Sequence, residues 1–485
     1  MTELTVLNGA TIQSLLTIPM AVRAVEQAYL EKSTGGAALW PMVFHEFTPG
    51  AADLDIKSGH MNGLGLYGMK VVSWFGDNPA KDLPALYGTS LLFDIHTGAP
   101  RALLNAGPIT DFRTGAAGAV GAKYLARPDA ETLLMAGTGA LAPYLIAAAL
   151  YCLPQLKTVY VANPHHPERS AAACTAIVPQ VEKLLAACGG CHAAITAAPS
   201  LETAAKQSDV ILTATPAREP FLKAEWVRPG THISCVGADM TGKQEIDSAL
   251  FSAARVFGDD AAQCLSVGEC EIPYKNGIFD GTLCDIGGVI SGAAPGRTGG
   301  EDITIFDSTG IALQDISTAA ALLDAARKNG QGQTIYNLYC DRCAAKGFPY
   351  SMAVGVVGFL GGNADYANGG NGEKTEAEFK NGWQPAVRNL VLGSGSIYGR
   401  RMVGGIVGRV GETSNGVVIE NCGNRTDVRN TDSKGVGGIC GSASGAGTIR
   451  GCYNTGTIST TYTCPAGGIL GTNEGMDVYN CYNAG

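Results

Sequence analysis

Two glycines, Gly137 and Gly139, separate an apolar run from a stretch long enough for a helix, and this arrangement constrains the fold more than any other feature. The run at 131–136 predicts a strand, and the apolar residues 141–153 predict a helix. In that context G-x-G-x-x-G/A binds a pyrophosphate, because glycine lets the backbone approach the phosphates and the helix offers free N–H groups. The sequence therefore predicts a dinucleotide site here, with an ordinary α/β turn as the alternative.

Further apolar runs follow, each separated from the next by a helical stretch or a loop. Strands are predicted at 157–162, 209–215, 232–237 and 255–259, and helices at 168–188 and 201–207. Short apolar strands that alternate with helices are typical of a Rossmann-type, doubly wound parallel sheet covered on both faces. Ligands of such a sheet bind beyond the carboxyl ends of its strands. We therefore expect Thr213, Ala214 and Thr215, with Val236 and Gly237, to line the cofactor edge.

Charge and hydropathy exclude several classes of function. A net charge of −9 without a basic run provides no electrostatic footprint for nucleic acid. No stretch of ~18 uncharged apolar residues predicts a membrane span. Residues 1–20 lack the basic start and unbroken apolar core of a signal peptide. For the first part of the chain we expect a cytoplasmic setting.

The 15 cysteines do not predict a metal site. The string from Cys188 to His192 matches the C-x-x-C-H haem-attachment pattern. It falls between a helix and the next strand of the sheet, so we interpret it as a surface loop. Cys340 and Cys343 form a C-x-x-C with no second pair, which argues against zinc.

The composition changes near Gly330, after which Gly, Asn, Thr and Ser dominate. Related glycine-rich strings occur at 403–408, 436–441 and 466–471, and between or after them lie Cys422, Cys452 and Cys481, spaced by 30 and 29 residues. A fixed period of this length with short β-prone pieces indicates a stacked β architecture. We expect the regular Asn and Cys positions to form internal ladders.

These units resemble the glycine-rich GLUG repeats of bacterial surface proteins, over about 402–485. The resemblance implies an all-β parallel solenoid and a surface setting. Surface adhesion or anchoring through the repeats is therefore one alternative function for the whole chain. The first part of the chain indicates a cytoplasmic setting instead. The chain is therefore either a genuine fusion of two proteins or a join made in sequence assembly or in the gene model.

Six separated blocks of the first two thirds of the chain together resemble the ornithine cyclodeaminase/mu-crystallin family. They lie, in order, at 67–70, 87–98, 109–117, 137–142, 236–247 and 303–312. The resemblance implies a nicotinamide-dependent homodimer with an α+β domain for substrate binding and dimerisation. The domains expected are 1–108 with 305–332 for substrate and dimerisation, 109–304 for the Rossmann domain, 333–401 as a linker or atypical first repeats, and 402–485 as the repeats.

Members of this family act at the α-carbon of an amino acid or its imine by hydride transfer. Such a substrate requires a cation for its carboxylate, because an unpaired buried carboxylate is expensive, and an acid or base near its nitrogen. Lys70 and Arg113 match family positions that bind the carboxylate, although Arg113 could instead face the cofactor pyrophosphate. Asp239 matches the catalytic aspartate, which would stabilise an iminium and relay a proton, and Lys70 would assist it. Taken singly, each residue also fits a purely structural role, such as a turn cap or a surface ion pair.

Two departures from the family's cyclodeaminases bear on the substrate. Their Glu, thirteen residues before the lysine, is replaced by Lys57, and the segment 41–46 offers no arginine for the substrate carboxylate. Lys57 is either a further cation for that carboxylate or a surface lysine. We expect an amino-acid dehydrogenase or imine reductase as readily as a cyclodeaminase. A non-enzymatic cofactor binder, as mu-crystallin is, remains an alternative.

The end of the second strand bears on the choice between NAD and NADP. NAD sites usually carry Asp or Glu there, whereas this chain has Asn163, with His165 and Arg169 nearby. These residues could accommodate a 2′-phosphate and favour NADP(H), the alternative being NAD held by Asn163. The full set of expected cofactor contacts is Thr89, Arg113, Thr114, Gly137, Gly139, Ala140, Leu141, Asn163, Arg169, Thr213, Ala214, Thr215, Val236, Gly237 and Ser308.

Overall fold

The computed structural model describes residues 3–190, 192–336, 353–354, 357–360, 385–393, 396–399, 401–411, 416–431 and 434–485. The predicted C-x-x-C at Cys340 and Cys343 lies outside the described residues, as do Cys191 and much of the expected linker at 333–401. The chain divides into two compact units. The larger consists of 8–99 and 103–330, and the smaller of 1–7, 100–102 and 331–485.

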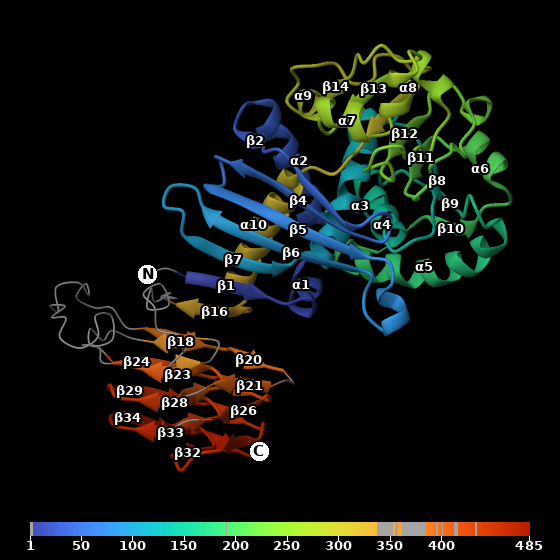
Figure 1. Ribbon diagram of the computed structural model, residues 1–485. Helices are drawn as coiled ribbons and strands as arrows, with labels where there is room; N and C mark the ends of the chain where they lie inside the picture. Colours follow the sequence, from blue (N-terminus) through green and yellow to red (C-terminus); the bar gives the residue numbers. More distant parts are fainter. Residues whose placement is uncertain are drawn as a thin grey trace. The chain divides into compact units, whose positions relative to one another are not determined.

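The larger unit contains an eight-stranded parallel sheet with helices on both faces (Figure 1). In spatial order its strands are β10 (Ala194–Ala197), β9 (Thr158–Ala162), β8 (Thr132–Ala136), β11 (Val210–Thr213), β12 (His232–Cys235), β15 (Thr304–Asp307), β13 (Arg255–Gly258) and β14 (Cys284–Asp285). The predicted doubly wound sheet is confirmed. Successive strands run outward from β8 in one direction and then, from β11, in the other. The carboxyl ends of β8 and β11 are therefore the switch point at which such sheets bind ligands.

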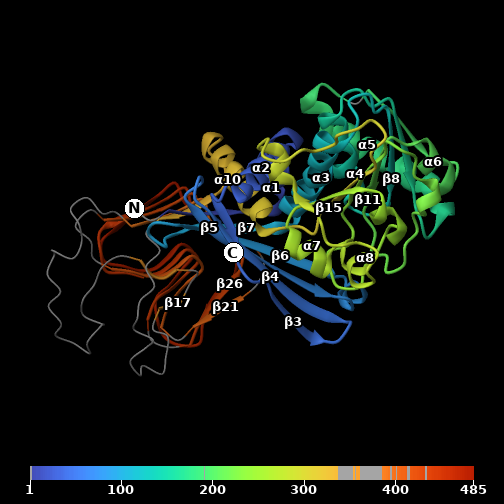
Figure 2. The same ribbon diagram turned by 90° about the horizontal axis from the view of Figure 1, so that it is seen from above.

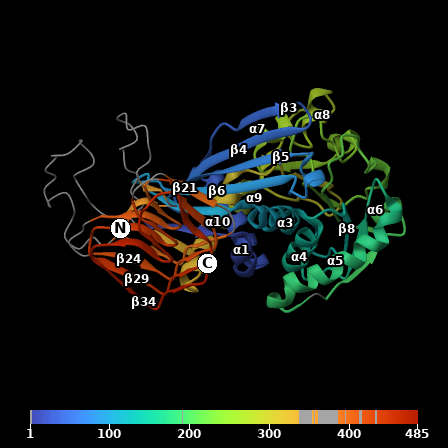
Figure 3. The ribbon, with the colours of Figure 1, turned by 60° about the horizontal axis from the view of Figure 1, so that its bottom comes forward.

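The helices around this sheet are α3 (Ala106–Leu125), α4 (Ala142–Cys152), α5 (Ser170–Leu185), α6 (Leu201–Gln207), α7 (Ala261–Val267), α8 (Glu271–Lys275) and α9 (Ile286–Ile290). Of these, α4, α5 and α6 lie close to the predicted 141–153, 168–188 and 201–207, whereas the other four were not predicted. Figure 3 shows α3 and α4 side by side, and the rings of Phe112 and Tyr144 meet edge-on with centroids 5.0 Å apart. In the chain, β8, the strand that leads into the glycine turn, follows α3 and precedes α4.

One helical segment of the described residues, Pro167–Cys188, is long and apolar enough to cross a membrane by length and composition alone. It contains α5, which packs against α4, β9 and β10. Its buried side chains include Ile177, Val181 and Leu185. The segment is thus a covering helix of the parallel sheet.

A second, antiparallel sheet in the larger unit carries the predicted Lys70. Its strands are β2 (Ala37–Leu39), β3 (Val43–Thr48), β4 (Ala52–Met61), β5 (Leu66–Phe75) and β6 (Leu86–Asp94), and β2 and β3 both pair with β4 (Figure 2). The helices α1 (Gly9–Leu15), α2 (Ile18–Ser33) and α10 (Ala312–Lys328) belong to the same unit, and β7 (Pro100–Asn105) leads into α3. Helix α10 lies in the segment 305–332 that was expected to complete the substrate domain, and it packs on β4 and β5. In the ladders Lys70 lies directly opposite Lys57 on one side and Ser90 on the other, so these three side chains share one face.

The smaller unit is built of short strands in parallel ladders. β1 (Glu3–Leu7) pairs antiparallel with β16 (Gln333–Tyr336), and β16 with β19 (Ala386–Arg388). From β19 one ladder continues through β24 (Val417–Glu420), β29 (Gly447–Arg450) and β34 (Met476–Tyr479), which Figure 1 shows one above another. The other ladders are β17 (Ala353–Val354), β22 (Met402–Gly404), β27 (Val436–Gly437) and β32 (Ala466–Gly467); β18 (Val357–Leu360), β23 (Val407–Val410), β28 (Cys440–Ala443) and β33 (Leu470–Asn473); β20 (Val391–Leu392), β25 (Gly423–Asn424), β30 (Tyr453–Asn454) and β35 (Tyr482–Asn483); and β21 (Ser396–Gly399), β26 (Asp427–Asn430) and β31 (Ile458–Thr460).

The predicted Asn ladder forms inside this unit. The side-chain amide of Asn424 donates to Asn454, and that of Asn454 donates to Asn483, each over 2.7 Å. Cys422 and Cys452 are buried beside it, and the backbone N–H of Cys422 donates to Cys452 Sγ at 3.4 Å. Each repeat therefore hydrogen-bonds to the next through equivalent side chains.

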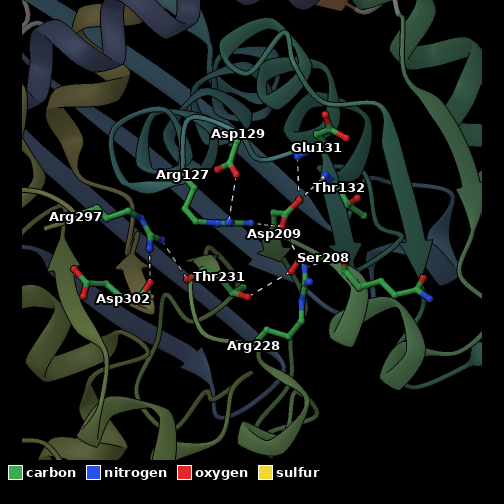
Figure 4. A network of polar contacts seen from close by, with 11 residues as sticks. Arg127, Asp129, Glu131, Thr132, Ser208, Asp209, Arg228, Thr231, Arg297 and Asp302 are labelled. Carbon is green, nitrogen blue, oxygen red and sulfur yellow. Dashed lines mark hydrogen bonds and ion pairs between the residues drawn. The ribbon is translucent and has the colours of Figure 1, made fainter. Parts of the chain in front are cut away.

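Asp209 anchors the opposite, amino edge of the eight-stranded sheet (Figure 4). Its carboxylate accepts hydrogen bonds from Arg127 at 2.7 Å and Arg228 at 3.1 Å. It also accepts from the backbone N–H groups of Glu131 at 2.9 Å and Thr132 at 3.1 Å. The side chain is only 12% exposed, so little water replaces these partners.

We expect Asp209→Ala to lower the free energy of unfolding of the larger unit by roughly 2–4 kcal/mol, because four donors lose a partly buried charged acceptor. Urea denaturation followed by circular dichroism measures the change. Asp129→Ala is the matched control, since Asp129 also contacts Arg127, at 3.4 Å, but is 75% exposed. The control should change stability by less than about 1 kcal/mol. Equal losses in the two variants would contradict the anchoring role.

Candidate active site

The glycine turn lies between β8 and α4, as predicted. Gly137 has a φ of +135°, and a Cβ there would lie 2.5 Å from the carbonyl oxygen of Ala214, so the position requires glycine. A Cβ on Gly139 would meet no described atom within 4 Å. No side chain caps the start of α4, whose N-cap is Leu141. Open backbone and uncapped N–H groups at the switch point fit a dinucleotide phosphate.

A glutamate that the sequence analysis did not assign, Glu245, ties the next strand ends together. It is fully buried, and its carboxylate accepts from Thr213 Oγ1 at 2.5 Å and from the N–H and Oγ1 of Thr215 at 2.6 and 2.8 Å. It also accepts from the N–H of Gly237 at 2.9 Å. Burial raises the pKa of Glu245 although these hydrogen bonds oppose the change. Three residues predicted to line the cofactor edge are thus held in place from behind by one carboxylate.

Lys70 and Arg113 meet at Asp315, a third residue that the sequence analysis did not assign. Lys70 Nζ lies 3.2 Å from Asp315 Oδ1, and Arg113 Nε lies 3.3 Å from the same oxygen. The exposed fractions of the three side chains are 4%, 8% and 3%. The guanidinium also donates through Nη1 to Gln314 Oε1 at 2.9 Å. The two predicted carboxylate-binding cations therefore come together from β5 and α3 around an acid on α10.

These contacts, together with burial, change the pKa values of both Lys70 and Asp315. Burial lowers the pKa of Lys70 to about 8, and the charge of Arg113 adds to the effect while Asp315 opposes it. Burial would raise the pKa of Asp315, but the charges of Arg113 and Lys70 outweigh it and keep that pKa below its usual value. Lys70 is thus protonated at neutral pH and titrates within the range of ordinary assays.

Lys57 is partly buried and lies close to the loop that joins β15 to α10. Its Nζ donates to the carbonyl oxygens of Thr309 at 3.4 Å and Gly310 at 3.1 Å. Asp55 lies two residues before it, on the same face of β4, and Asp55 Oδ1 is buried without a hydrogen-bond partner among the described residues. Burial raises the pKa of Asp55, which Lys57 and Lys70 partly offset. Lys57 and Asp55 therefore extend the polar cluster that begins at Lys70.

Asp239 follows β12 and is 48% exposed. Its carboxylate is 2.6 Å from Lys243 Nζ. Desolvation by its surroundings would raise the pKa of Asp239, but the charges of Lys243 and Lys57 outweigh this and lower it. Asp239 is therefore a carboxylate at neutral pH, in electrostatic range of the cluster around Lys57.

The remaining predicted residues lie at several places. Asn163 donates through Nδ2 to Thr138 Oγ1 at 2.8 Å and accepts from the N–H of His166 at 2.9 Å, so its side chain closes the turn after β9. Arg169 is exposed and lies 3.9 Å from Glu168. Thr114, Val236 and Ser308 are buried, and Ala140 is exposed in the glycine turn. Thr89 pairs with Val71 and so lies on the face of β6 away from Lys70.

No group of three or more His, Cys, Asp or Glu side chains in the described ranges is arranged to hold a metal ion. A cleft of about 580 Å³ lies beside the amino end of β13 and includes Arg255, Phe279 and Cys284. It contains none of the predicted site residues.

Comparison with known proteins decides the family. A model of the ornithine cyclodeaminase/mu-crystallin family matches residues 2–330. The chain belongs to this family. It is 34% identical to an alanine dehydrogenase of Archaeoglobus fulgidus, over 69% of this chain and 98% of that protein. It is 32% identical to an iminosuccinate reductase of Paracoccus denitrificans, over 67% and 97%.

Solved structures of the family agree with the fold. An archaeal alanine dehydrogenase dimer with bound NAD has a TM-score of 0.61 and 33% identity, covering 69% of this chain and 99% of its own. The Thermococcus litoralis Δ1-pyrroline-2-carboxylate reductase, in complex with NADH and L-proline, has a TM-score of 0.60 and 28% identity, covering 68% and 99%. As a member of this family the protein is an enzyme, either an NAD(P)-dependent oxidoreductase or a cyclodeaminase.

Proposed function

We propose that this enzyme interconverts a small amino acid and its 2-imino acid with a nicotinamide cofactor. The observation that carries the proposal is the buried cation pair Lys70 and Arg113, brought together from two elements around Asp315. Asp315 neutralises only one of these two buried positive charges, and the carboxylate of a substrate would supply the second negative charge. The related alanine dehydrogenase, iminosuccinate reductase and pyrroline-2-carboxylate reductases support a 2-amino or 2-imino acid as the substrate class.

In this proposal Lys70 and Arg113 bind the substrate carboxylate, and Lys57 adds positive charge to the same side. Asp239 lies near the substrate nitrogen, where its carboxylate stabilises an iminium and holds or returns a proton through water. Gly137, Gly139 and the start of α4 hold the cofactor phosphates, with Thr213 to Thr215, Val236, Gly237 and Ser308 along the strand ends. The cofactor, when bound, supplies or accepts the hydride.

We favour dehydrogenase or reductase activity over cyclisation of ornithine. Lys57 stands where the family's cyclodeaminases have a glutamate, and it donates to two backbone carbonyls instead. A diamino acid has a second cationic nitrogen that a lysine at this place would repel. Turnover of ornithine to proline at a rate above that of any 2-imino acid would overturn this preference.

A coupled screen tests the proposal. Pyruvate, oxaloacetate, glyoxylate and Δ1-pyrroline-2-carboxylate are each supplied with NADH or NADPH, with ammonium added for the oxo acids, and cofactor absorbance is followed. Consumption of cofactor that depends on both carbonyl acid and ammonium, or on the cyclic imine, supports it. Cofactor binding without any turnover would favour a non-enzymatic binder.

We propose NADP(H) as the preferred cofactor. Asn163 Oδ1 already accepts from the N–H of His166 in its own turn, and Nδ2 donates to Thr138 in the glycine turn, so the amide is poorly placed to accept from a ribose 2′-hydroxyl. Arg169, six residues later, is exposed, and its ion pair with Glu168 is long at 3.9 Å, so its guanidinium is available for a 2′-phosphate.

Arg169→Ala should therefore raise KM for NADPH by about tenfold and leave KM for NADH unchanged, because an exposed charge on the phosphate contributes modestly. Initial rates with both cofactors measure this. The exposed Arg218 gives a control, Arg218→Ala, which should change neither constant. A rise in KM for NADH that equals the rise for NADPH would refute the assignment.

We propose a homodimer formed through the antiparallel sheet. Every side chain of β3 is exposed. Large apolar side chains of the same sheet and its loops are exposed, on and just before β3 (Trp40, Met42, Val43, Phe44 and Phe47) and just before and at the start of β6 (Leu83, Leu86 and Tyr87). An exposed apolar edge strand is a liability unless a partner covers it, and the related archaeal enzyme is a dimer.

We also propose that the smaller unit is a parallel β-solenoid of GLUG-like repeats and that the enzyme part is cytoplasmic. The parallel ladders and the Asn ladder at 424, 454 and 483 support the first point. The family model matches residues 2–330, so membership of the family gives no function for the repeats.

A further inference from the structure

We propose that Asp315 is the positioning residue of this site, holding Lys70 and Arg113 together as a preformed receptor for the substrate carboxylate. The inference rests on the proposed function and deepens it. Asp315 belongs to α10, which follows the parallel sheet in the chain, whereas Lys70 belongs to β5 and Arg113 to α3. One side chain therefore sets the distance between two cations from different elements.

The geometry makes Asp315 necessary for that arrangement. Both cations contact the same atom, Asp315 Oδ1, at 3.2 and 3.3 Å. Without a negative charge between them, a lysine and an arginine this close and this buried would repel each other. Asp315 Oδ2 is buried and has no hydrogen-bond partner among the described residues. The carboxylate is therefore committed to these two cations through one oxygen.

The adjacent residue of α10 fixes the orientation of the guanidinium. Gln314 accepts from Arg113 Nη1 at 2.9 Å, and its own amide donates to Tyr29 Oη at 2.5 Å. Arg113 has five N–H donors and Lys70 has three, of which these contacts use only a part. The remaining donors can face a substrate carboxylate while Asp315 and Gln314 hold the two cations from behind.

The charges around Lys70 give the proposal a signature that a purely structural role lacks. Arg113 on α3 and Lys57 on β4 disfavour its ammonium form, whereas Asp315 on α10 and Asp55 on β4 favour it. Removing the charge of Asp315 should lower the pKa of Lys70 further, so that it loses its proton at a lower pH. Removing the charge of Arg113 should have the opposite effect. The two substitutions should therefore move the same titration in opposite directions.

The test measures binding of pyruvate to the NADPH complex of the full-length chain between pH 6 and pH 10. In the wild type, binding should weaken as pH rises through about 8, where Lys70 deprotonates. In Asp315→Asn the weakening should begin at a lower pH, and Kd for pyruvate at pH 7 should rise at least about tenfold. Kd for NADPH, followed by its fluorescence, should change less than about twofold, since Asp315 pairs with Lys70 and Arg113, which this proposal assigns to the substrate carboxylate and not to the cofactor.

Two further variants keep the result decisive. Asp324→Asn makes the same chemical change at an exposed position of α10 and should alter neither Kd nor the pH profile. Arg113→Gln should move the weakening to higher pH, and it decides the question alone if Asp315→Asn does not fold. A pH profile unchanged in Asp315→Asn, or moved to lower pH in Arg113→Gln, would overturn the role of Asp315. Absence of pyruvate binding and of turnover in the wild type would instead overturn the proposed function.

Discussion

Replacing Asp239 with asparagine is expected to lower kcat by about 10²–10⁴ while Kd for the cofactor stays within about twofold. Asparagine keeps the shape of the side chain but neither takes up a proton nor balances the charge of an iminium. Asp239 is half-exposed beyond β12, and its carboxylate pairs with Lys243 Nζ at 2.6 Å. We assign this carboxylate no contact with the cofactor. Steady-state rates and fluorescence titration of the same preparation separate the two effects.

The control for this prediction is Lys70→Met. Loss of the Lys70 charge should lower kcat/KM through a higher KM, because the carboxylate of the substrate loses a buried cation.

The pH dependence of wild-type activity at acid pH gives a further check on Asp239. Since the pKa of Asp239 is lowered, the carboxylate persists as pH falls, and activity should be lost only below the usual carboxyl range. Near-wild-type kcat in Asp239→Asn would make Asp239 a turn residue bonded to Lys243.

The second large effect is expected from Gly139→Val, which should weaken cofactor binding by on the order of 100-fold or more, because a branched side chain blocks the approach of the pyrophosphate to the turn. The fold should survive, since a Cβ at Gly139 meets no described atom within 4 Å. Fluorescence titration with NADH and NADPH gives the affinity, and thermal melting checks the fold.

Gly137→Val is the matched comparison two residues earlier. Its φ of +135° and the carbonyl oxygen of Ala214, 2.5 Å from the Cβ, predict strain in the protein itself and a lower melting temperature. Unchanged cofactor affinity in a folded Gly139→Val variant would remove the glycine turn from the proposed site.

The parts of this enzyme that local sequence dictates were predictable. The strand before Gly137 and the helix after it depend on apolar periodicity and on glycine, and both are visible within some ten residues, whereas the return of the chain to the substrate domain was expected from the family resemblance. The contacts of Asp315 and Glu245 are not visible in that way. Asp315 meets Lys70 across 245 positions of sequence, and Glu245 reaches back to Thr213 and Thr215 across another strand.

Thr89 illustrates a different limit. It was predicted to contact the cofactor from its place in a sequence block, but the pairing of β5 with β6 puts Ser90, not Thr89, on the face that carries Lys70. A shift of one residue reverses the face of a strand, and only the register of the ladder settles which side chain points inward. The role of either residue toward the cofactor stays a prediction.

The position of Asp315 on the last helix of the larger unit also has a consequence for synthesis on the ribosome. Lys70 and Arg113 emerge long before their shared counter-ion, so a nascent chain that ends before α10 must leave two cations solvated. Contacts between residues so distant in sequence form late, because the intervening chain has to be closed first. We expect the face of the antiparallel sheet that carries Lys70 to stay uncovered until α10 emerges. Lys70 should then become buried when α10 packs on β4 and β5.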